Sequence, residues 1–317
     1  MCPRLKAPSS RASTKHERTL ILPPESAGRL DATLSRLLSG VSRRRLKAAF
    51  KEGRILQDGR AARGSDSAIP EAHVRMLDLP DSGAWSPAPE PEPDNLGIEV
   101  VYQDSTIVVA EKPAGVPSHP RDPGEGGSVA EILLRMLPDM HGVGDHPDAP
   151  GLCHRLDVDT SGLLLFARTN EAFQAIRRQF REHSIDKRYV AAVGGVLEGY
   201  GTIDVRIGRQ SKRRMIANPP ANIRAWPART KWKVRAAADR STLLDVTLET
   251  GVTHQVRVHL AWLGHPVMGD ARYGGVPAPR LGLHACRLGL RHPSTNEWVT
   301  VESRRGEEVA DMVVGAR

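Results

Sequence analysis

The chain has 317 residues, 39% hydrophobic and 26% charged, which fits a soluble globular protein of about two domains. No apolar run approaches the roughly 18 residues that cross a bilayer, and the N-terminus lacks the apolar segment of a secretory signal. The three cysteines are far apart and form no C-x-x-C pair, which argues against a disulfide framework and a thiolate zinc site. We therefore expect a cytoplasmic protein without a membrane partner.

The net charge of +8 is distributed unevenly along the chain. Residues 1–80 contain sixteen Lys or Arg and eight Asp or Glu; of totals of 45 and 37, this leaves 29 of each sign in residues 81–317. A positive field concentrated in the first quarter of the chain suits a polyanionic partner, such as RNA or DNA.

The N-terminal part of the chain is expected to contain a small basic domain of α/β type. Residues 1–27 are predicted to form a flexible arm, although their basic, acid-poor beginning is also compatible with an organellar transit peptide. Leucines at helical spacing predict a helix over residues 30–38, and an apolar stripe predicts a basic helix over residues 43–51. With a following strand and tight turn, these elements predict a domain over residues 28–79.

Residues 80–96 are rich in Pro and acids and predict a semi-rigid linker. A larger domain is expected over residues 97–305, with a tail at residues 306–317. Apolar runs predict two short strands around a turn at residues 104–105 and further strands at residues 162–168, 188–195, 242–251 and 298–303. Helices are predicted at residues 170–183 and 254–263. Many strands with few helices indicate an α+β fold with a mixed, mostly antiparallel sheet.

Polar residues are densest in HRLDVDTSG (154–162), directly before an apolar strand. A calcium loop would need Glu at its twelfth position, where Arg168 stands. A phosphatase D-x-D motif would follow a strand, whereas here the strand comes after the acids. A lone catalytic carboxylate held by arginine is the third interpretation.

The segment HRLDVDTSGLLLFAR closely resembles the signature of the RluA-type pseudouridine synthases. VVYQDSTIVVAEKPAGVPSHP resembles the family's first motif, KRYVAAVGG its tyrosine-bearing strand, and ETGVTHQVRVHLAWLGHPVMGDARYG its third motif. LGLHACRLGLRHPSTNEWVTVES resembles its C-terminal end, so the likeness covers about residues 97–303. Residues 29–78 separately resemble the alpha-L RNA-binding domain that often precedes such synthases.

The resemblance implies an enzyme that detaches uracil from ribose, rotates it and rejoins it through carbon, without metal or organic cofactor. Asp157 matches the catalytic carboxylate and Arg257 the arginine that pairs with it; attack by Asp157 on the sugar or on the base stays open. Tyr189 matches a tyrosine that could stack on the flipped uracil and assist proton transfer. His154 is expected to be a structural hydrogen bonder rather than a base.

The implied partner is structured RNA, with large-subunit ribosomal RNA favoured over transfer RNA, and the implied oligomeric state is a monomer. Residues expected to contact RNA are Arg155, His254 and the basic side chains of the second helix, Arg43, Arg44, Arg45, Lys47 and Lys51. The family usually has T-G-R-T-H-Q, and Val252 replaces the arginine of that motif. This departure affects RNA affinity or target choice more than chemistry, and it leaves an inactive RNA-binding assembly factor as a rival interpretation.

Overall fold

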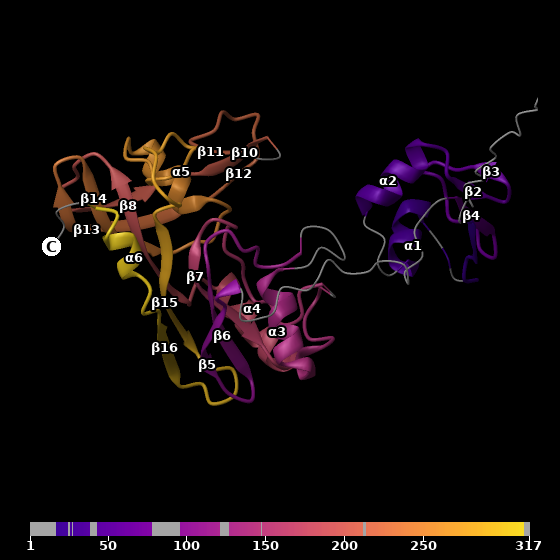
Figure 1. Cartoon of the computed structure of the whole chain (residues 1–317), viewed down its shortest axis with the longest axis horizontal. Coiled ribbons are helices and arrows are strands. Elements are labelled where there is room, and N and C mark those ends of the chain that lie inside the picture. The colour runs from indigo at the N-terminus through magenta and orange to yellow at the C-terminus, as the bar shows by residue number, and fades with distance from the viewer. Residues whose placement is uncertain are drawn as a thin grey trace, which may run out of the picture. The chain divides into compact units, whose positions relative to one another are not determined.

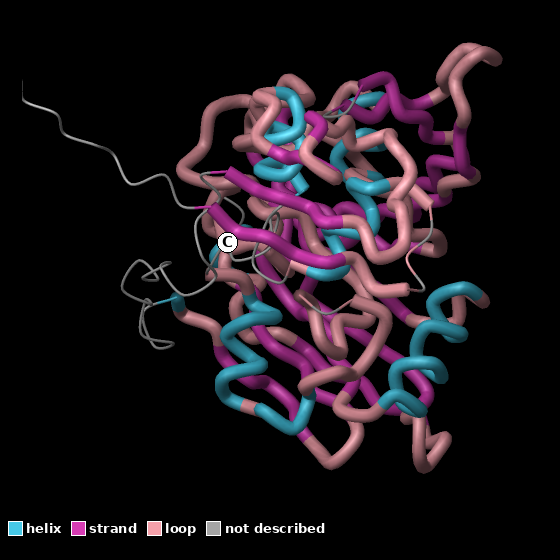
Figure 2. Tube along the Cα trace, turned by 90° about the vertical axis from the view of Figure 1, so that its right-hand side faces the viewer, coloured by secondary structure: helices cyan, strands magenta, loops and turns pink. Residues whose placement is uncertain are grey.

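The computed structural model describes residues 17–24, 26, 28–38, 43–77, 96–120, 127–146, 148–211 and 214–313. This part of the chain divides into two compact units, unit 1 between residues 17 and 77 and unit 2 between residues 96 and 313. Strands and loops make up most of both units (Figure 2). No helix in the described ranges is long and apolar enough to cross a membrane. Of the expected linker, only Leu96 is described.

Unit 1 is a four-stranded sheet with two helices (Figure 1). The strand order is β1-β4-β2-β3, with bounds Glu17–Ile21, His73–Leu77, Ile55–Gln57 and Arg60–Ala61. The helices are α1 (Leu30–Leu37) and α2 (Arg43–Lys51). Leucines and other apolar residues from all these elements except β3 share one buried core.

Within the expected flexible arm of residues 1–27, Glu17–Ile21 form β1, and residues 1–16 lie outside the described residues. This strand pairs antiparallel with β4 from Glu17 opposite Leu77 to Ile21 opposite His73. Leu22, which follows it, is buried in the core of unit 1. The paired backbone and the buried leucine therefore tie this segment to the sheet.

Unit 2 is built on a nine-stranded mixed sheet of order β5-β6-β7-β15-β8-β14-β13-β9, with β16 paired to β15. Only β15 and β7 pair in parallel, so the sheet is mostly antiparallel, as expected for the α+β class. In that order the bounds are Glu99–Gln103, Ile107–Lys112, Ser161–Ala167, Leu283–Arg291, Asp186–Gly194, Ser241–Leu248, Arg229–Ala238 and Tyr200–Asp204, with β16 at Trp298–Glu302.

Helices cover both faces of this sheet. The helices are α3 (Val129–Met136), α4 (Asn170–Arg181), α5 (Gln255–Trp262) and α6 (Glu307–Ala310), with a 3-10 turn η2 at Pro138–Met140. Every residue of β6 and β7 is buried, and alternate residues contact α3 on one face and α4 on the other. Two covered faces explain why these strands are continuous apolar runs.

The expected tail at residues 306–317 begins with an ordered helix. The apolar side chains of Val309, Met312 and Val313 recur at helical spacing, and two of them, Val309 and Val313, are buried against β8 and β14. The catalytic domain of the sequence prediction therefore continues to Val313 in the structure.

A small three-stranded sheet, which the sequence did not predict, lies beside α5. Its order is β11-β10-β12, with bounds Arg214–Ala217, Ile207–Ser211 and Ala225–Trp226. Ile207 and Met215 pack against Val258 of α5, so this sheet is fixed to the helix that carries Arg257.

Candidate active site

A pocket of about 590 Å³ opens beside α4, β8 and α5 in unit 2. Asp157, Tyr189 and Arg257, which the sequence predicts as the catalytic residues, all line this pocket. Arg155 and His254, two of the expected RNA contacts, line it as well. The fold thus brings together residues from three separate segments of the sequence.

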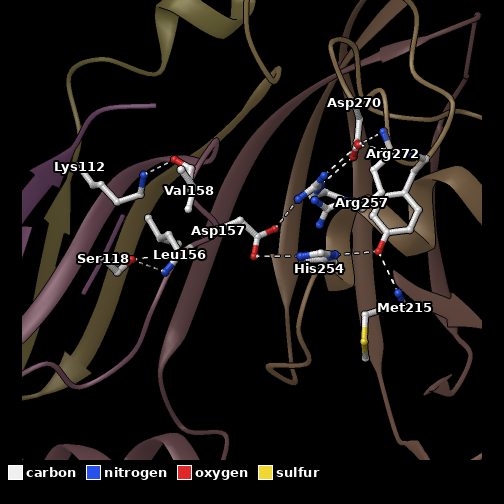
Figure 3. A network of polar contacts seen from close by, with 11 residues as sticks. Lys112, Ser118, Leu156, Asp157, Val158, Met215, His254, Arg257, Asp270 and Arg272 are labelled. Atoms are coloured by element: carbon white, nitrogen blue, oxygen red, sulfur yellow. Dashed lines mark hydrogen bonds and ion pairs between the residues drawn. The ribbon is translucent and has the colours of Figure 1, made fainter. Parts of the chain in front are cut away.

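The loop that carries Asp157 is held on both sides by hydrogen bonds to its backbone. The hydroxyl of Ser118 donates to the Leu156 carbonyl at 3.0 Å and accepts the Leu156 N–H at 3.1 Å. Lys112, fully buried at the end of β6, donates to the Val158 carbonyl at 2.7 Å (Figure 3). The backbones of both neighbours of Asp157, Leu156 and Val158, are therefore held, which restricts where its carboxylate can point.

Arg257 connects Asp157 to a second carboxylate. Its Nη1 donates to Asp157 Oδ2 at 2.9 Å, while Nε and Nη2 donate to the two oxygens of Asp270 at 2.7 and 2.9 Å (Figure 3). The side chains of Arg257 and Asp270 are 6% and 1% exposed, whereas that of Asp157 is 24% exposed. Asp270 thus holds two nitrogens of the guanidinium on its buried side. The third nitrogen donates to Asp157, and of the two carboxylates it is Asp157 that lines the pocket.

The charge of Arg257 is secured by these two neighbours. Burial alone would lower the pKa of Arg257, but the hydrogen bonds to Asp270 and Asp157 raise it above its ordinary value. Arg257 therefore presents a charged N–H donor to the Asp157 carboxylate.

His254 lies on the other side of the Asp157 carboxylate. Its Nε2 is 3.8 Å from Asp157 Oδ1, and its Nδ1 is 2.7 Å from the Tyr273 hydroxyl, which accepts the Met215 N–H at 3.2 Å (Figure 3). Because the hydroxyl oxygen already accepts from Met215, its proton is free to donate to Nδ1, which assigns the ring proton to Nε2, facing Asp157. Burial lowers the pKa of His254 despite the nearby Asp157, so this ring is neutral. RNA contact by His254 stays a prediction.

Tyr189 lies on β8, where its side chain contacts the buried core and also lines the pocket. It packs against the buried clusters on both sides of it and still lines the pocket. Burial, and then the negative charge of Asp157, raise the pKa of the Tyr189 hydroxyl, so the phenol keeps its proton. The structure therefore offers Asp157 a neutral phenol as a neighbour.

The two residues before Leu156 differ in their surroundings. His154 accepts the Leu165 N–H at its Nε2 at 3.1 Å, and burial, with the charges of Lys187 and Arg177, lowers its pKa to about 3. This neutral acceptor matches the expected structural role. Arg155 is exposed and lines the pocket, as a residue that meets RNA would be.

The expected RNA contacts of unit 1 lie on α2. Lys47 and Lys51 are exposed on this helix. The side chains of Arg43, Arg44 and Arg45 lie outside the described part of the structure. Their roles in RNA binding stay predictions.

Val252, which stands where the family usually has arginine, has an apolar environment. Its side chain packs with Ile207 and Met215 of the small sheet, and its N–H donates to the Gln255 side chain at 3.0 Å. The same loop position thus contributes packing here instead of a charge.

Several residues of the site were not predicted from the sequence. Asp270 and Tyr273 both fall within the third motif, but a lone Asp after Gly is more typical of a turn, and their partners are distant in sequence. Lys112 and Ser118 sit in the first motif, where nothing local shows that they reach the loop of Asp157. No group of three His, Cys, Asp or Glu side chains within the described ranges could hold a metal ion.

Comparisons with known proteins identify the family of this chain. A family model described as RNA pseudouridylate synthase matches residues 106–262. An uncharacterized RNA pseudouridine synthase of Aquifex aeolicus is 34% identical over 88% of this chain and 90% of its own length. Ribosomal large subunit pseudouridine synthase D of Nitrosomonas europaea is 33% identical over 98% of this chain and 91% of its own.

A solved structure indicates the same family. That of human RNA Pseudouridylate Synthase Domain Containing 1 superposes with a TM-score of 0.53 at 29% identity, covering 65% of this chain and 82% of the human one. The chain therefore belongs to the RluA-type RNA pseudouridine synthases, a family of isomerases.

Proposed function

We propose that this enzyme converts selected uridines of large-subunit ribosomal RNA to pseudouridine, with Asp157 as its catalytic carboxylate. The observation that carries the proposal is the Asp157 side chain, fixed by Arg257 at 2.9 Å yet 24% exposed in a pocket of nucleotide size. The name of the Nitrosomonas europaea relative supports ribosomal RNA as the substrate class. Transfer RNA is the second candidate.

The reaction breaks the bond between ribose C1′ and uracil N1 and forms one between C1′ and C5. C5 loses its proton and N1, which carries none in uridine, gains one, so the atoms balance and no oxidant, reductant or energy source is consumed. Asp157 can serve as nucleophile toward the sugar or toward the base, and both routes need it ionised. We assign Tyr189 to stack on the uracil, and its hydroxyl to assist the proton transfer from C5.

The target uridine must leave its base stack to reach Asp157, because the carboxylate lies inside a pocket rather than on an open surface. Arg155, exposed beside the pocket, is suited to contact phosphate or to occupy the space left by the flipped base. In unit 1, the alpha-L-like domain, Lys47 and Lys51 of α2 bind the RNA backbone without sequence specificity. The enzyme is expected to act in the cytoplasm as a monomer.

Mapping pseudouridines in total RNA of cells with and without the gene tests this function. We expect defined sites in large-subunit ribosomal RNA to disappear, to return with the wild-type gene and not to return with Asp157→Ala. Asp159→Ala is the matched control, because Asp159 is an exposed carboxylate two residues further on and does not line the pocket. Restoration of cellular function by Asp157→Ala without pseudouridine would instead favour the RNA-binding assembly factor.

A further inference from the structure

Lys187 is a buried ammonium group that the mechanism above does not use. It lies on β8 with 7% of its surface exposed, yet it lines the active-site pocket. Its Nζ donates one hydrogen bond, to the Thr250 carbonyl at 3.1 Å, although an ammonium group has three protons to donate. No carboxylate in the described part of the chain contributes to its ionisation, and burial alone lowers the pKa of Lys187 to about 8.

The wall of the pocket near Lys187 is positively charged. Five Arg or Lys side chains line the pocket against two carboxylates, and one of those carboxylates, Asp157, is already paired with Arg257. Arg177 and Arg181 lie one turn apart on the same face of α4 and line the same pocket. A buried cation without a counter-ion is costly, and an incoming anion would remove that cost.

The position of Lys187 matches the chemistry of a nucleotide substrate. Lys187 and Tyr189 point to the same face of β8, separated by about 7 Å along the strand. Tyr189 lies within the electrostatic influence of Asp157, where the uracil ring must sit. Lys187 lies two residues along the strand from Tyr189. Its ammonium group is therefore separated from the base by about the distance between base and phosphate within one nucleotide.

We propose that Lys187, with Arg177 and Arg181, forms a subsite for a phosphodiester group adjoining the flipped uridine. The inference rests on the proposed function, since it assigns part of the same RNA substrate to the pocket. Its role is positioning: the phosphate anchors the extruded nucleotide so that its glycosidic bond lies over Asp157. Chemistry at C1′ and C5 needs no atom of Lys187.

The alternative is that Lys187 only supports the loop that begins at Thr250. That loop has other supports, because the Thr250 hydroxyl donates to the Gln255 side chain at 2.8 Å and accepts the Arg229 N–H at 2.9 Å. A purely structural lysine would affect stability and leave the electrostatics of RNA binding unchanged. The two roles therefore differ in salt dependence.

The test measures RNA affinity as a function of salt in the Asp157→Ala background, where no product forms. The probe is an unmodified large-subunit ribosomal RNA transcript. We expect Lys187→Met to weaken binding about tenfold and Lys187→Arg to restore most of it. The slope of log affinity against log salt should fall by about 0.7 to 0.9, the loss of one phosphate contact.

Lys233→Met is the matched control, because this exposed lysine on β13 does not line the active-site pocket, and its slope should stay at the value of the parent. Arg181→Met tests the same subsite at an exposed residue, where the substitution does not disturb the core. It should lower the slope in the same way. An unchanged slope in both Lys187→Met and Arg181→Met would overturn the subsite. Pseudouridine formation is measured separately, with Asp157 intact. An unchanged salt slope would therefore overturn the subsite and not the proposed function, and absence of pseudouridine would overturn the proposed function and not phosphate binding by Lys187.

Discussion

At the scale of single residues, the site depends on one guanidinium shared between two carboxylates. Asp157 and Arg257 are 100 positions apart, and only their family motifs pointed to a pair. Asp270 is the residue that makes this pair geometrically definite, since its two oxygens fix the plane of the Arg257 side chain. Sequence reasoning missed it because the need for a second carboxylate appears only once the buried arginine is seen.

Removing Asp270 should therefore cost both stability and activity. Asp270→Ala leaves Arg257 buried with a single partner, and we expect the free energy of unfolding to fall by about 3–5 kcal/mol. Glu308→Gln is the control, because it breaks the exposed pair with Arg280 and should cost at most about 1 kcal/mol. Urea denaturation of the three proteins gives the comparison, and equal losses in the two variants would contradict the clamp.

The buried His154 should make stability depend on pH. The unfolded chain protonates this ring near pH 6.5, whereas in the folded protein its pKa is about 3, so protonation favours unfolding. Its contribution is fully present above pH 6.5 and is lost as the pH falls toward 3. Between pH 6 and 5 we expect His154→Gln to lower the slope of unfolding free energy against pH by up to about 1.4 kcal/mol per unit. Identical slopes for the variant and the wild type would show that the ring is not held neutral.

At the scale of elements, apolar runs were sufficient to predict strands that are buried on both faces. Strand β7 and helix α4 lie within one or two residues of their predicted bounds. The small sheet β10–β12 was missed because its strands are only two to five residues long and owe their order to packing against α5. Helix α6 was missed because four residues are too few for a periodic signal.

Lys112 is the link between β6 and the catalytic loop. Its ammonium group donates to three carbonyls, those of Pro113, Val116 and Val158, and Gly115 N–H donates to Val158 as well. In Lys112→Met these carbonyls lose the ammonium donor and the loop loosens, so we expect faster hydrogen exchange at the Gly115 amide and a lower kcat. RNA affinity should stay as in the wild type, since Lys112 does not line the pocket. Unchanged exchange and kcat would exclude Lys112 as a positioning residue.

At the scale of the whole molecule, positive charge is distributed more widely than the comparison of residues 1–80 with residues 81–317 suggests. Residues 81–317 balance overall, yet residues 205–230 contain seven Arg or Lys and no acid. This stretch covers the small sheet that packs on α5, the helix of Arg257. The sequence count assigned all the excess charge to residues 1–80, because averaging over the other 237 residues conceals this local cluster.

The measurement that tests the central claim most directly is single-turnover pseudouridine formation by Asp157→Asn on unmodified large-subunit ribosomal RNA. Asparagine keeps the shape of the side chain and an acceptor for Arg257 but removes the negative charge. We expect no pseudouridine while the Kd for RNA stays that of the wild type, because the charge is needed for bond exchange and not for docking. Pseudouridine formation by this variant at the wild-type rate would contradict the role assigned to the Asp157 carboxylate.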